Sequence, residues 1–212
     1  MSSLSFLCVF SARVRTWAAL ACVAAGMAGP ALAADAPEPP HAQPLQPIPS
    51  LDLPRYMGRW HEIARFPNGF QKDCAGDSSA DYQLNADGTV QVLNRCRLAN
   101  GEFKEALGQA RRVGAPGSPR LQVRFAPAWL SFIPAVWGDY WVVDLDPAYQ
   151  LVAVTEPRRE YLWVLARSPQ VREADYRALL ERLRAQGLDV ARLQQSSPFS
   201  PEPAPAGDTP AP

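Results

Sequence analysis

Residue types that commonly carry catalysis are sparse in this sequence of 212 residues. Its two histidines are His41 and His61, and the run Gly76-Asp77-Ser78-Ser79 resembles part of an esterase nucleophile motif. No histidine follows that run to act as the base, and no G-x-S-x-G, H-E-x-x-H or phosphate-binding glycine loop occurs. The sequence therefore predicts that the protein is not an enzyme.

Metal-binding patterns are equally weak. Asn85 to Gly88 resembles part of a calcium-binding loop, but the position where such a loop needs glutamate holds Asn94. We expect a hairpin turn at residues 85–88, no metal and no cofactor. Four aspartates that could form carboxylate pairs are better explained as solvated strand ends: Asp81, Asp139, Asp144 and Asp146.

The first 33 residues have the pattern of a secretory signal peptide. Arg13 and Arg15 precede an apolar stretch, and Ala31-Leu32-Ala33 supplies the small residues after which signal peptidase cuts. We expect an exported, soluble protein in the periplasm or associated with the outer membrane. Two alternatives stay open: an uncleaved anchor, and a lipoprotein in which Cys22 is lipidated instead of removed.

Four cysteines occur in the chain, and Cys8 and Cys22 fall within that signal peptide. The remaining two are Cys74 and Cys96. Two cysteines in an exported domain favour one disulfide, with free buried thiols as the alternative. Without a nearby histidine, two cysteines are too few ligands for a zinc site.

Proline content sets the expected domain boundaries. Prolines are dense in residues 34–50 and again in residues 196–212, where few apolar groups are available for burial. We expect a disordered linker and a disordered tail there, with one domain over residues 51–195. The formal net charge is zero, so the sequence offers no large basic face for nucleic acid.

Eight short runs, separated by turn residues, fill that domain. Consecutive strands joined by short turns pair antiparallel, and eight of them can close into an up-and-down barrel. The predicted fold class is therefore all-β, an eight-stranded antiparallel barrel, with an open two-sheet sandwich as the alternative. The predicted strands are residues 58–66, 80–84, 89–97, 102–113, 121–125, 139–145, 150–155 and 161–167.

One amphipathic helix is predicted after the last strand. Ser168 is a suitable N-cap, Pro169 suits the first helical position, and Gly187 suits the end. We expect the apolar stripe of this helix to pack on the outside of the barrel. The stripe consists of Tyr176, Leu179, Leu180 and Leu183.

Three segments of the chain carry a family resemblance. The run from Tyr56 to Pro67, YMGRWHEIARFP, closely resembles the opening strand of lipocalins with its G-x-W motif. The likeness continues through Val92-Leu93-Asn94 and through Asp144 to Tyr149, a loose match to the second family motif. It ends at Tyr161 to Arg167, YLWVLAR, whose arginine matches the third. The chain is identified as a member of the lipocalin family over residues 51–193, and it looks most like bacterial outer-membrane lipocalins and apolipoprotein D.

The matched motif residues also have a physical interpretation. A tryptophan on the first strand can plug the closed end of a barrel, and an arginine before the helix can lie across its ring in a cation–π contact. We interpret Gly58, Trp60 and Arg167 as a structural latch of this kind. Apolipoprotein D has a cysteine at the position of Cys74 but pairs it near its C-terminus, where this chain has none. Cys96 is then the available partner.

The resemblance implies a ligand cavity, and an eight-stranded barrel is just wide enough to hold one small ligand. Period-two alternation from Trp60 and Arg167 puts mostly apolar side chains on the inner face, with Glu62 as the one charged candidate and Arg124 outward. In lipocalins similar to apolipoprotein D, residues matching Tyr82, Asn94 and Trp163 contact the ligand. The predicted ligand-binding residues are Tyr82, Val92, Asn94, Val123, Phe125, Tyr161, Trp163 and Leu165. A filled core without ligand is the alternative.

Residues 126–138 form an apolar loop with hardly a charge. Its aromatic residues are Trp129, Phe132 and Trp137, and an exposed apolar patch of this kind usually marks a binding surface. We expect this loop either to cover the cavity as a lid or to make peripheral contact with a membrane, where tryptophan is favoured.

These observations predict a protein that stores or transports a hydrophobic, lipid-like ligand, either a fatty acid or a lysophospholipid, in the bacterial cell envelope. The alternative is an enzyme with the lipocalin fold, isomerase-like, that acts on a bound lipid. Only an activated acid–base group inside the cavity would favour that alternative, and Glu62 is the candidate.

Overall fold

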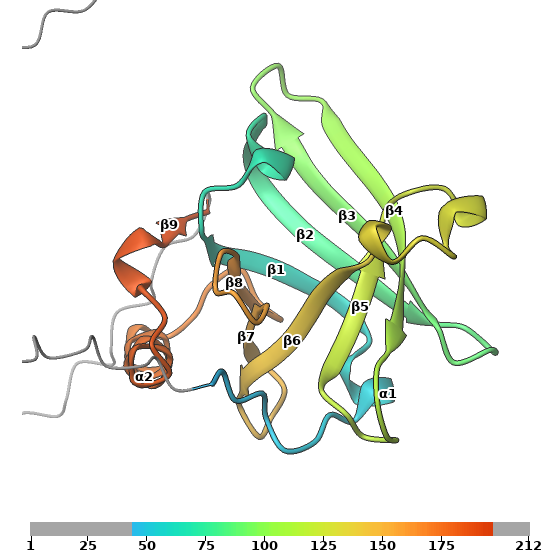
Figure 1. The fold of residues 1–212 in the computed structure, drawn as a ribbon. Coiled ribbons are helices and arrows are strands. Elements are labelled where there is room, and N and C mark those ends of the chain that lie inside the picture. Colours follow the sequence, from blue (N-terminus) through green and yellow to red (C-terminus); the bar gives the residue numbers. More distant parts are fainter. Residues whose placement is uncertain (1–43, 197–212) are drawn as a thin grey trace, which may run out of the picture. The chain divides into compact units, whose positions relative to one another are not determined.

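Eight strands close into an antiparallel barrel in the computed structural model, which describes residues 44–196 (Figure 1). Each strand pairs with the next along the chain, and β1 pairs with both β2 and β8, which closes the sheet. The predicted barrel is confirmed, and the open sandwich is excluded. The strands are β1 (Gly58–Arg65), β2 (Cys74–Leu84), β3 (Val90–Leu98), β4 (Phe103–Arg112), β5 (Arg120–Arg124), β6 (Gly138–Leu145), β7 (Leu151–Thr155) and β8 (Leu162–Ala166).

The start of β2 differs most from the prediction. This strand begins at Cys74, six residues before the predicted start at Ala80. The pairing of β2 with β3 shifts register twice between Cys74 and Ser79, and Asp77 has a positive φ of 51°. Each shift leaves one residue of β2 without a partner in β3, and such irregular pairing is not visible in a local sequence pattern.

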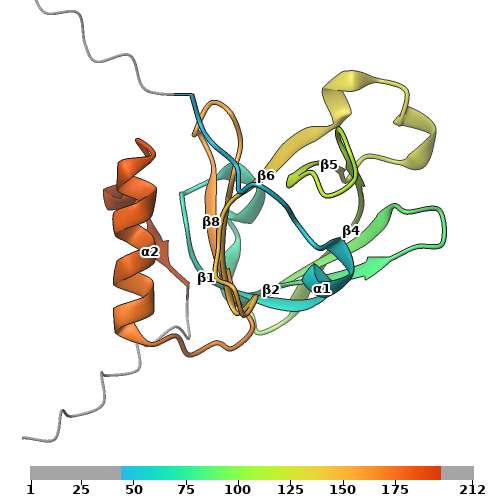
Figure 2. The same cartoon turned by 90° about the horizontal axis from the view of Figure 1, so that it is seen from below.

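One end of the barrel is closed by the segment before β1. The chain from Pro44 crosses this end and forms the short helix α1 (Leu53–Tyr56), as Figure 2 shows. The backbone N–H of Ile48 donates to the Val142 oxygen at 2.9 Å, and that of Leu51 donates to the Gly117 oxygen at 2.8 Å. This part of the predicted linker, residues 44–50, is therefore packed on the barrel. The predicted signal peptide and the rest of the proline-rich segments lie outside the described residues.

The second helix, α2 (Glu173–Ala185), runs along the outside of the barrel (Figure 2). Ser168 does not cap this helix, because the chain bends at residues 167–169 and α2 begins only at Glu173; the Ser168 hydroxyl accepts a hydrogen bond from the Gln170 N–H instead. The predicted end is confirmed by Gly187, whose φ of +77° suits glycine. After α2, the short strand β9 (Gln194–Gln195) pairs with β1.

Residues 44–196 also contain four 3₁₀ turns: η1 (Gly69–Gln71), η2 (Ala128–Leu130), η3 (Pro134–Val136) and η4 (Val190–Arg192). Within residues 44–196, neither α-helix has the length and apolar character needed to cross a membrane.

Two separate apolar cores hold these elements. The outer core lies between α2 and the sheet, where Leu179, Leu183 and Val164 are fully buried. The inner core lies at the closed end, around Trp60 and Tyr56. Above the inner core the barrel is hollow, and that space is the candidate site.

Candidate ligand-binding cavity

The interior of the barrel contains a cavity of about 830 Å³. This volume lies within the range of about 300–1,000 Å³ found for small-molecule sites. Side chains from β2 to β5 line its wall, and most of them are apolar, among them Ala80, Val90, Val92, Leu121 and Val123. A hollow of this size argues against the alternative of a filled core.

All eight predicted ligand-binding residues line this cavity. They come from four strands or their ends, β2, β3, β5 and β8: Tyr82, Val92, Asn94, Val123, Phe125, Tyr161, Trp163 and Leu165. Inward alternation therefore places them correctly, since each strand turns alternate side chains to the lumen. Their contact with a ligand stays a prediction.

The sequence interpretation missed the residues that close the two ends of the cavity. At the closed end, α1 contributes Leu53 and Tyr56, and β6 contributes Tyr140. At the open end, η1 contributes Phe70 and Gln71. Asp52 and Pro54 were an available signal for α1, because an aspartate N-cap followed by proline in the first turn favours a helix start.

The predicted latch contact is present at the closed end. The guanidinium of Arg167 lies 3.9 Å from the centre of the Trp60 ring, and Trp60 is fully buried. Arg167 also donates hydrogen bonds to the carbonyl oxygens of Arg59 at 2.9 Å and of Arg55 and Tyr56 at 3.1 Å each. Because two of those carbonyls belong to the last turn of α1, this arginine holds the helix that closes the barrel.

Glycine is required at position 58 of the latch. Its φ is +93°, and a Cβ there would come within 3.3 Å of the Arg167 guanidinium. The glycine of the G-x-W motif thus leaves room for the Arg167 guanidinium to reach the Trp60 ring.

Three tyrosines meet above the latch. The Tyr140 hydroxyl lies 2.7 Å from the Tyr56 hydroxyl and 3.2 Å from the Tyr82 hydroxyl. Burial raises the pKa of Tyr56 and Tyr140 well above the usual value, and it raises the pKa of Tyr82 to about 12. All three phenols are therefore protonated at neutral pH, and we refer to them as the tyrosine cluster.

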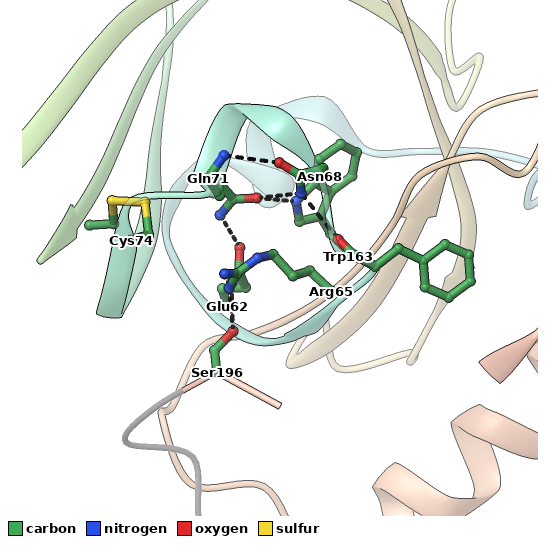
Figure 3. A network of polar contacts seen from close by, with 9 residues as sticks. Glu62, Arg65, Asn68, Gln71, Cys74, Trp163 and Ser196 are labelled. Carbon is green, nitrogen blue, oxygen red and sulfur yellow. Dashed lines mark hydrogen bonds and ion pairs between the residues drawn. A yellow bond between two sulfur atoms is a disulfide. The ribbon is translucent and has the colours of Figure 1, made fainter. Parts of the chain in front are cut away.

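A second polar network, centred on Glu62, lies near the open end (Figure 3). One carboxylate oxygen of Glu62 accepts from Arg65 at 2.6 Å and from the Ser196 hydroxyl at 2.5 Å, and the other accepts from Gln71 at 2.5 Å. Gln71 in turn accepts from the Trp163 indole N–H at 2.9 Å. The network therefore ties η1 to the cavity wall and to the end of β9.

These contacts weaken the case for Glu62 as a catalytic base, because both of its oxygens already accept hydrogen bonds from protein groups. The expectation that Glu62 is the one inward charge is wrong. The lining also includes Arg95, Lys104, Glu105, Asp139, Glu156 and Arg158. Several of these are well exposed at the rim, where water solvates their charges.

The carboxylate of Glu156 has a structural role in the rim. It accepts hydrogen bonds from the backbone N–H groups of Arg158 at 2.6 Å, Glu160 at 2.5 Å and Tyr161 at 3.3 Å. It therefore shapes the turn between β7 and β8, and it offers no free base to the cavity.

The disulfide between Cys74 and Cys96 is confirmed, with 5.6 Å between the two Cα atoms. It joins β2 to β3, and both cysteines line the cavity. Because Cys74 follows η1 closely, the bond anchors the rim segment that carries Gln71.

The apolar loop divides into two parts. Trp129 and Phe132 are 72% and 77% exposed, whereas Trp137 lines the cavity and packs under two arginines. Those are Arg111, 4.0 Å from the ring centre, and Arg124, 5.3 Å from it.

Arg124 points away from the lumen, as the alternation predicts, but it is buried and not exposed to solvent. It does not line the cavity, but the loop buries it, and it donates hydrogen bonds to the Ala126 oxygen at 2.6 Å and to Gln109 at 2.7 Å. Replacing Arg124 is therefore expected to disturb the loop at residues 126–138 even though this side chain does not line the cavity.

No group of three or more His, Cys, Asp or Glu side chains comes together within residues 44–196 to hold a metal. At the predicted hairpin turn, the Asp87 carboxylate accepts from the backbone N–H and the hydroxyl of Thr89, at 2.9 Å and 2.6 Å. That carboxylate stabilises the turn between β2 and β3.

A closed eight-stranded antiparallel barrel with an apolar lumen and one outer helix defines a class of small-ligand-binding proteins. The family model for the lipocalin-like domain matches residues 51–198. The chain belongs to the lipocalin family, whose members generally bind or transport hydrophobic ligands.

Two curated relatives and one solved structure show how far the similarity extends. Temperature-induced lipocalin-1 of Arabidopsis thaliana is 39% identical over 168 residues, which cover 78% of this chain and 85% of that protein. The outer membrane lipoprotein Blc of Vibrio cholerae is 33% identical over 151 residues, covering 70% and 84%. Insecticyanin from the tobacco hornworm Manduca sexta superposes with a TM-score of 0.56 at 16% identity, covering 78% of this chain and 94% of that one, and supports the fold alone.

Proposed function

We propose that this protein binds a single-chain lipid, a fatty acid or a lysophospholipid, in the barrel cavity and stores or transports it without chemical conversion. The observation that carries the proposal is the 830 Å³ apolar cavity, which runs from the tyrosine cluster to an open rim. Among the lining residues of the part of the chain that the structure describes, Cys74 and Cys96 are joined in a disulfide and the Ser78 hydroxyl has no base as a hydrogen-bond partner, which supports binding without conversion.

The affinity follows from the lining. Each buried methylene contributes about 0.8 kcal/mol, so a long acyl chain contributes on the order of 10 kcal/mol before the cost of immobilising it. A net dissociation constant of about 1 μM corresponds to about 8 kcal/mol and is the expected magnitude.

We also propose that the protein works in a bacterial cell envelope. The secretory pattern of residues 1–33 supports this location, and so does the similarity to an outer membrane lipoprotein of Vibrio cholerae. Mass analysis of the mature N-terminus separates the two routes. Cleavage after Ala33 is expected, and a lipid on Cys22 would establish the anchored form.

The exposed part of the apolar loop suits contact with a membrane surface. Trp129 and Phe132 project into solvent close to Trp137, which lines the cavity, so a lipid leaving a bilayer would have a short path to the site. Replacement of both exposed aromatics by serine is expected to weaken vesicle binding while the affinity for a soluble fatty acid stays the same.

A chain-length series tests the central proposal. Affinity for saturated fatty acids is expected to rise with each added methylene until the cavity is full, and Trp163→Ala is expected to weaken binding by removing lining area. Gln91→Ala is the matched control, because Gln91 lies on β3 between two lining residues and points to solvent. Equal affinity from short to long chains, with Trp163→Ala silent, would refute the proposal.

A further inference from the structure

The tyrosine cluster contains one hydroxyl proton more than its own hydrogen bonds use. Three phenols carry three O–H protons, and two hydrogen bonds join them, both through Tyr140. Each bond uses one proton, so one O–H remains without an acceptor within residues 44–196, whichever way the two bonds run. A buried donor left in this state carries a desolvation penalty unless something accepts its proton.

The free proton can be presented to the cavity. Tyr56 is only 2% exposed, whereas Tyr82 and Tyr140 are partly exposed and line the lumen. The hydroxyl donor therefore lies at the closed end of a cavity whose wall is otherwise largely apolar.

The electrostatic surroundings favour an acceptor that is neutral or negative. The positive charge of Arg167 acts on both Tyr56 and Tyr82 and offsets part of the rise in pKa that burial causes. No carboxylate is among the groups that shift the pKa of the three tyrosines. Burial also keeps the phenols protonated, so they remain donors throughout the neutral pH range.

We propose that the tyrosine cluster is a polar subsite that donates a hydrogen bond to a carbonyl or carboxyl oxygen of the ligand. The ligand then lies with its oxygen-bearing end at the closed end of the barrel and its apolar body toward the rim. This inference rests on the proposed lipid-binding function and narrows it. A fatty acid fits with its carboxyl group inward, whereas a lysophospholipid would present a bare methyl end to the tyrosines.

The proton count dictates which variant tests the proposal. Removing the Tyr140 hydroxyl alone frees Tyr82 to donate, and removing that of Tyr82 alone still leaves Tyr140. The informative variant is therefore the double Tyr82→Phe/Tyr140→Phe, which removes the hydroxyls of the two partly exposed tyrosines and leaves only that of Tyr56, whose residue is 2% exposed. Tyr176→Phe is the matched control, because Tyr176 belongs to α2 and its side chain packs in the outer core, away from the cavity.

The assay measures displacement of the apolar fluorophore phenylnaphthylamine by dodecanoic acid, methyl dodecanoate and dodecane. The wild type is expected to prefer the acid and the ester over the hydrocarbon. The double variant is expected to lose at least about tenfold of that preference, as for a hydrogen bond to a charged or carbonyl acceptor, with dodecane affinity within about twofold of wild type. On a logarithmic scale, each single variant is expected to lose less than half as much of the preference for the acid over the hydrocarbon as the double variant loses.

Infrared spectroscopy of the bound ester tests the proposal on the wild-type protein alone, so the result does not depend on whether a variant folds. The ester carbonyl band is expected to move to lower frequency in the wild type, as it does on accepting a hydrogen bond. A band at the position of a free ester would overturn the proposal. An unchanged preference for acid over hydrocarbon in the double variant would also overturn the proposed subsite. If all three ligands still bound tightly in that case, the lipid-binding function would stand without the subsite. Failure of the wild type to bind any of them would instead refute the function itself.

Discussion

Truncation of the two latch residues tests how the barrel is closed. Trp60 is fully buried, donates its indole N–H to the Tyr56 oxygen at 2.9 Å and lies 3.9 Å from the Arg167 guanidinium. Trp60→Ala is expected to lower the free energy of unfolding by about 3–5 kcal/mol, as for other buried aromatic truncations. For a domain of this size that corresponds to a fall in Tm of roughly 6–20 °C.

Arg167→Ala removes one cation–π contact and the hydrogen bonds to the carbonyls at the end of α1. Arg167 is only half-buried, so water replaces part of what is lost, and we expect a cost of about 2–3 kcal/mol. Because the guanidinium and the indole ring touch, the double variant should cost less than the sum of the singles. A coupling of about 1–2 kcal/mol is expected.

Urea unfolding of the two single variants, the double variant and the wild type gives this coupling directly. Arg192→Ala is the control, because its guanidinium lies over Phe66 and not over Trp60. Its combination with Trp60→Ala is expected to be additive. Additivity of Trp60→Ala and Arg167→Ala to within about 0.5 kcal/mol would refute the reasoning, since it would mean that the contact contributes nothing.

Three further predictions concern the disulfide, the buried ion pair and alkaline pH. Peptide mapping without reductant should find Cys74 joined to Cys96, and two alkylatable thiols in the native protein would contradict this. Replacing both cysteines by serine should lower the free energy of unfolding by about 3 kcal/mol, as expected for a closed loop of this length. Glu62→Gln breaks the buried pair and should cost about 3 kcal/mol in urea unfolding, whereas Asp81→Asn at an exposed pair should cost less than about 1 kcal/mol. Because burial raises the pKa of Tyr82 to about 12, the unfolded chain loses that proton first as pH rises. Stability should be unaffected by this group below about pH 10 and should fall between about pH 10 and 12, with a smaller fall for Tyr82→Phe when unfolding is followed by circular dichroism.

The sequence predicts the barrel well because alternation is a local property. In β3 and β5, Val92 and Val123 lie on the inner face as the pattern indicates. The prediction misses the start of β2, where the pairing with β3 shifts register twice between Cys74 and Ser79, and the start of α2, which lies at Glu173 and not next to Ser168. Bulges and approach angles depend on the partner strand and on packing, neither of which a local pattern contains.

Only part of the candidate site could be predicted from the sequence, because a local pattern indicates the side walls but not the ends of the cavity. The side walls follow from strand alternation, but the ends of the cavity depend on segments brought together across the chain. Tyr56 and Tyr140 are 84 residues apart, and Gln71 and Trp163 are 92 apart. Residues of this kind carry no periodic signal, so only the folded structure brings the tyrosine cluster and the Glu62 network into view.

The two apolar cores have a consequence for how this barrel can change over evolutionary time. The outer core under α2 is packed against strands β1 and β6 to β8, while most of the hollow wall comes from β2 to β5. The outer-core residues and the residues that line the cavity are thus different sets. Substitutions such as Val92→Ala or Val123→Leu reshape the lumen and leave the helix–sheet interface as it is. A barrel of this kind can therefore accept changes in its ligand-binding wall while the contacts that fix the helix to the sheet stay unchanged.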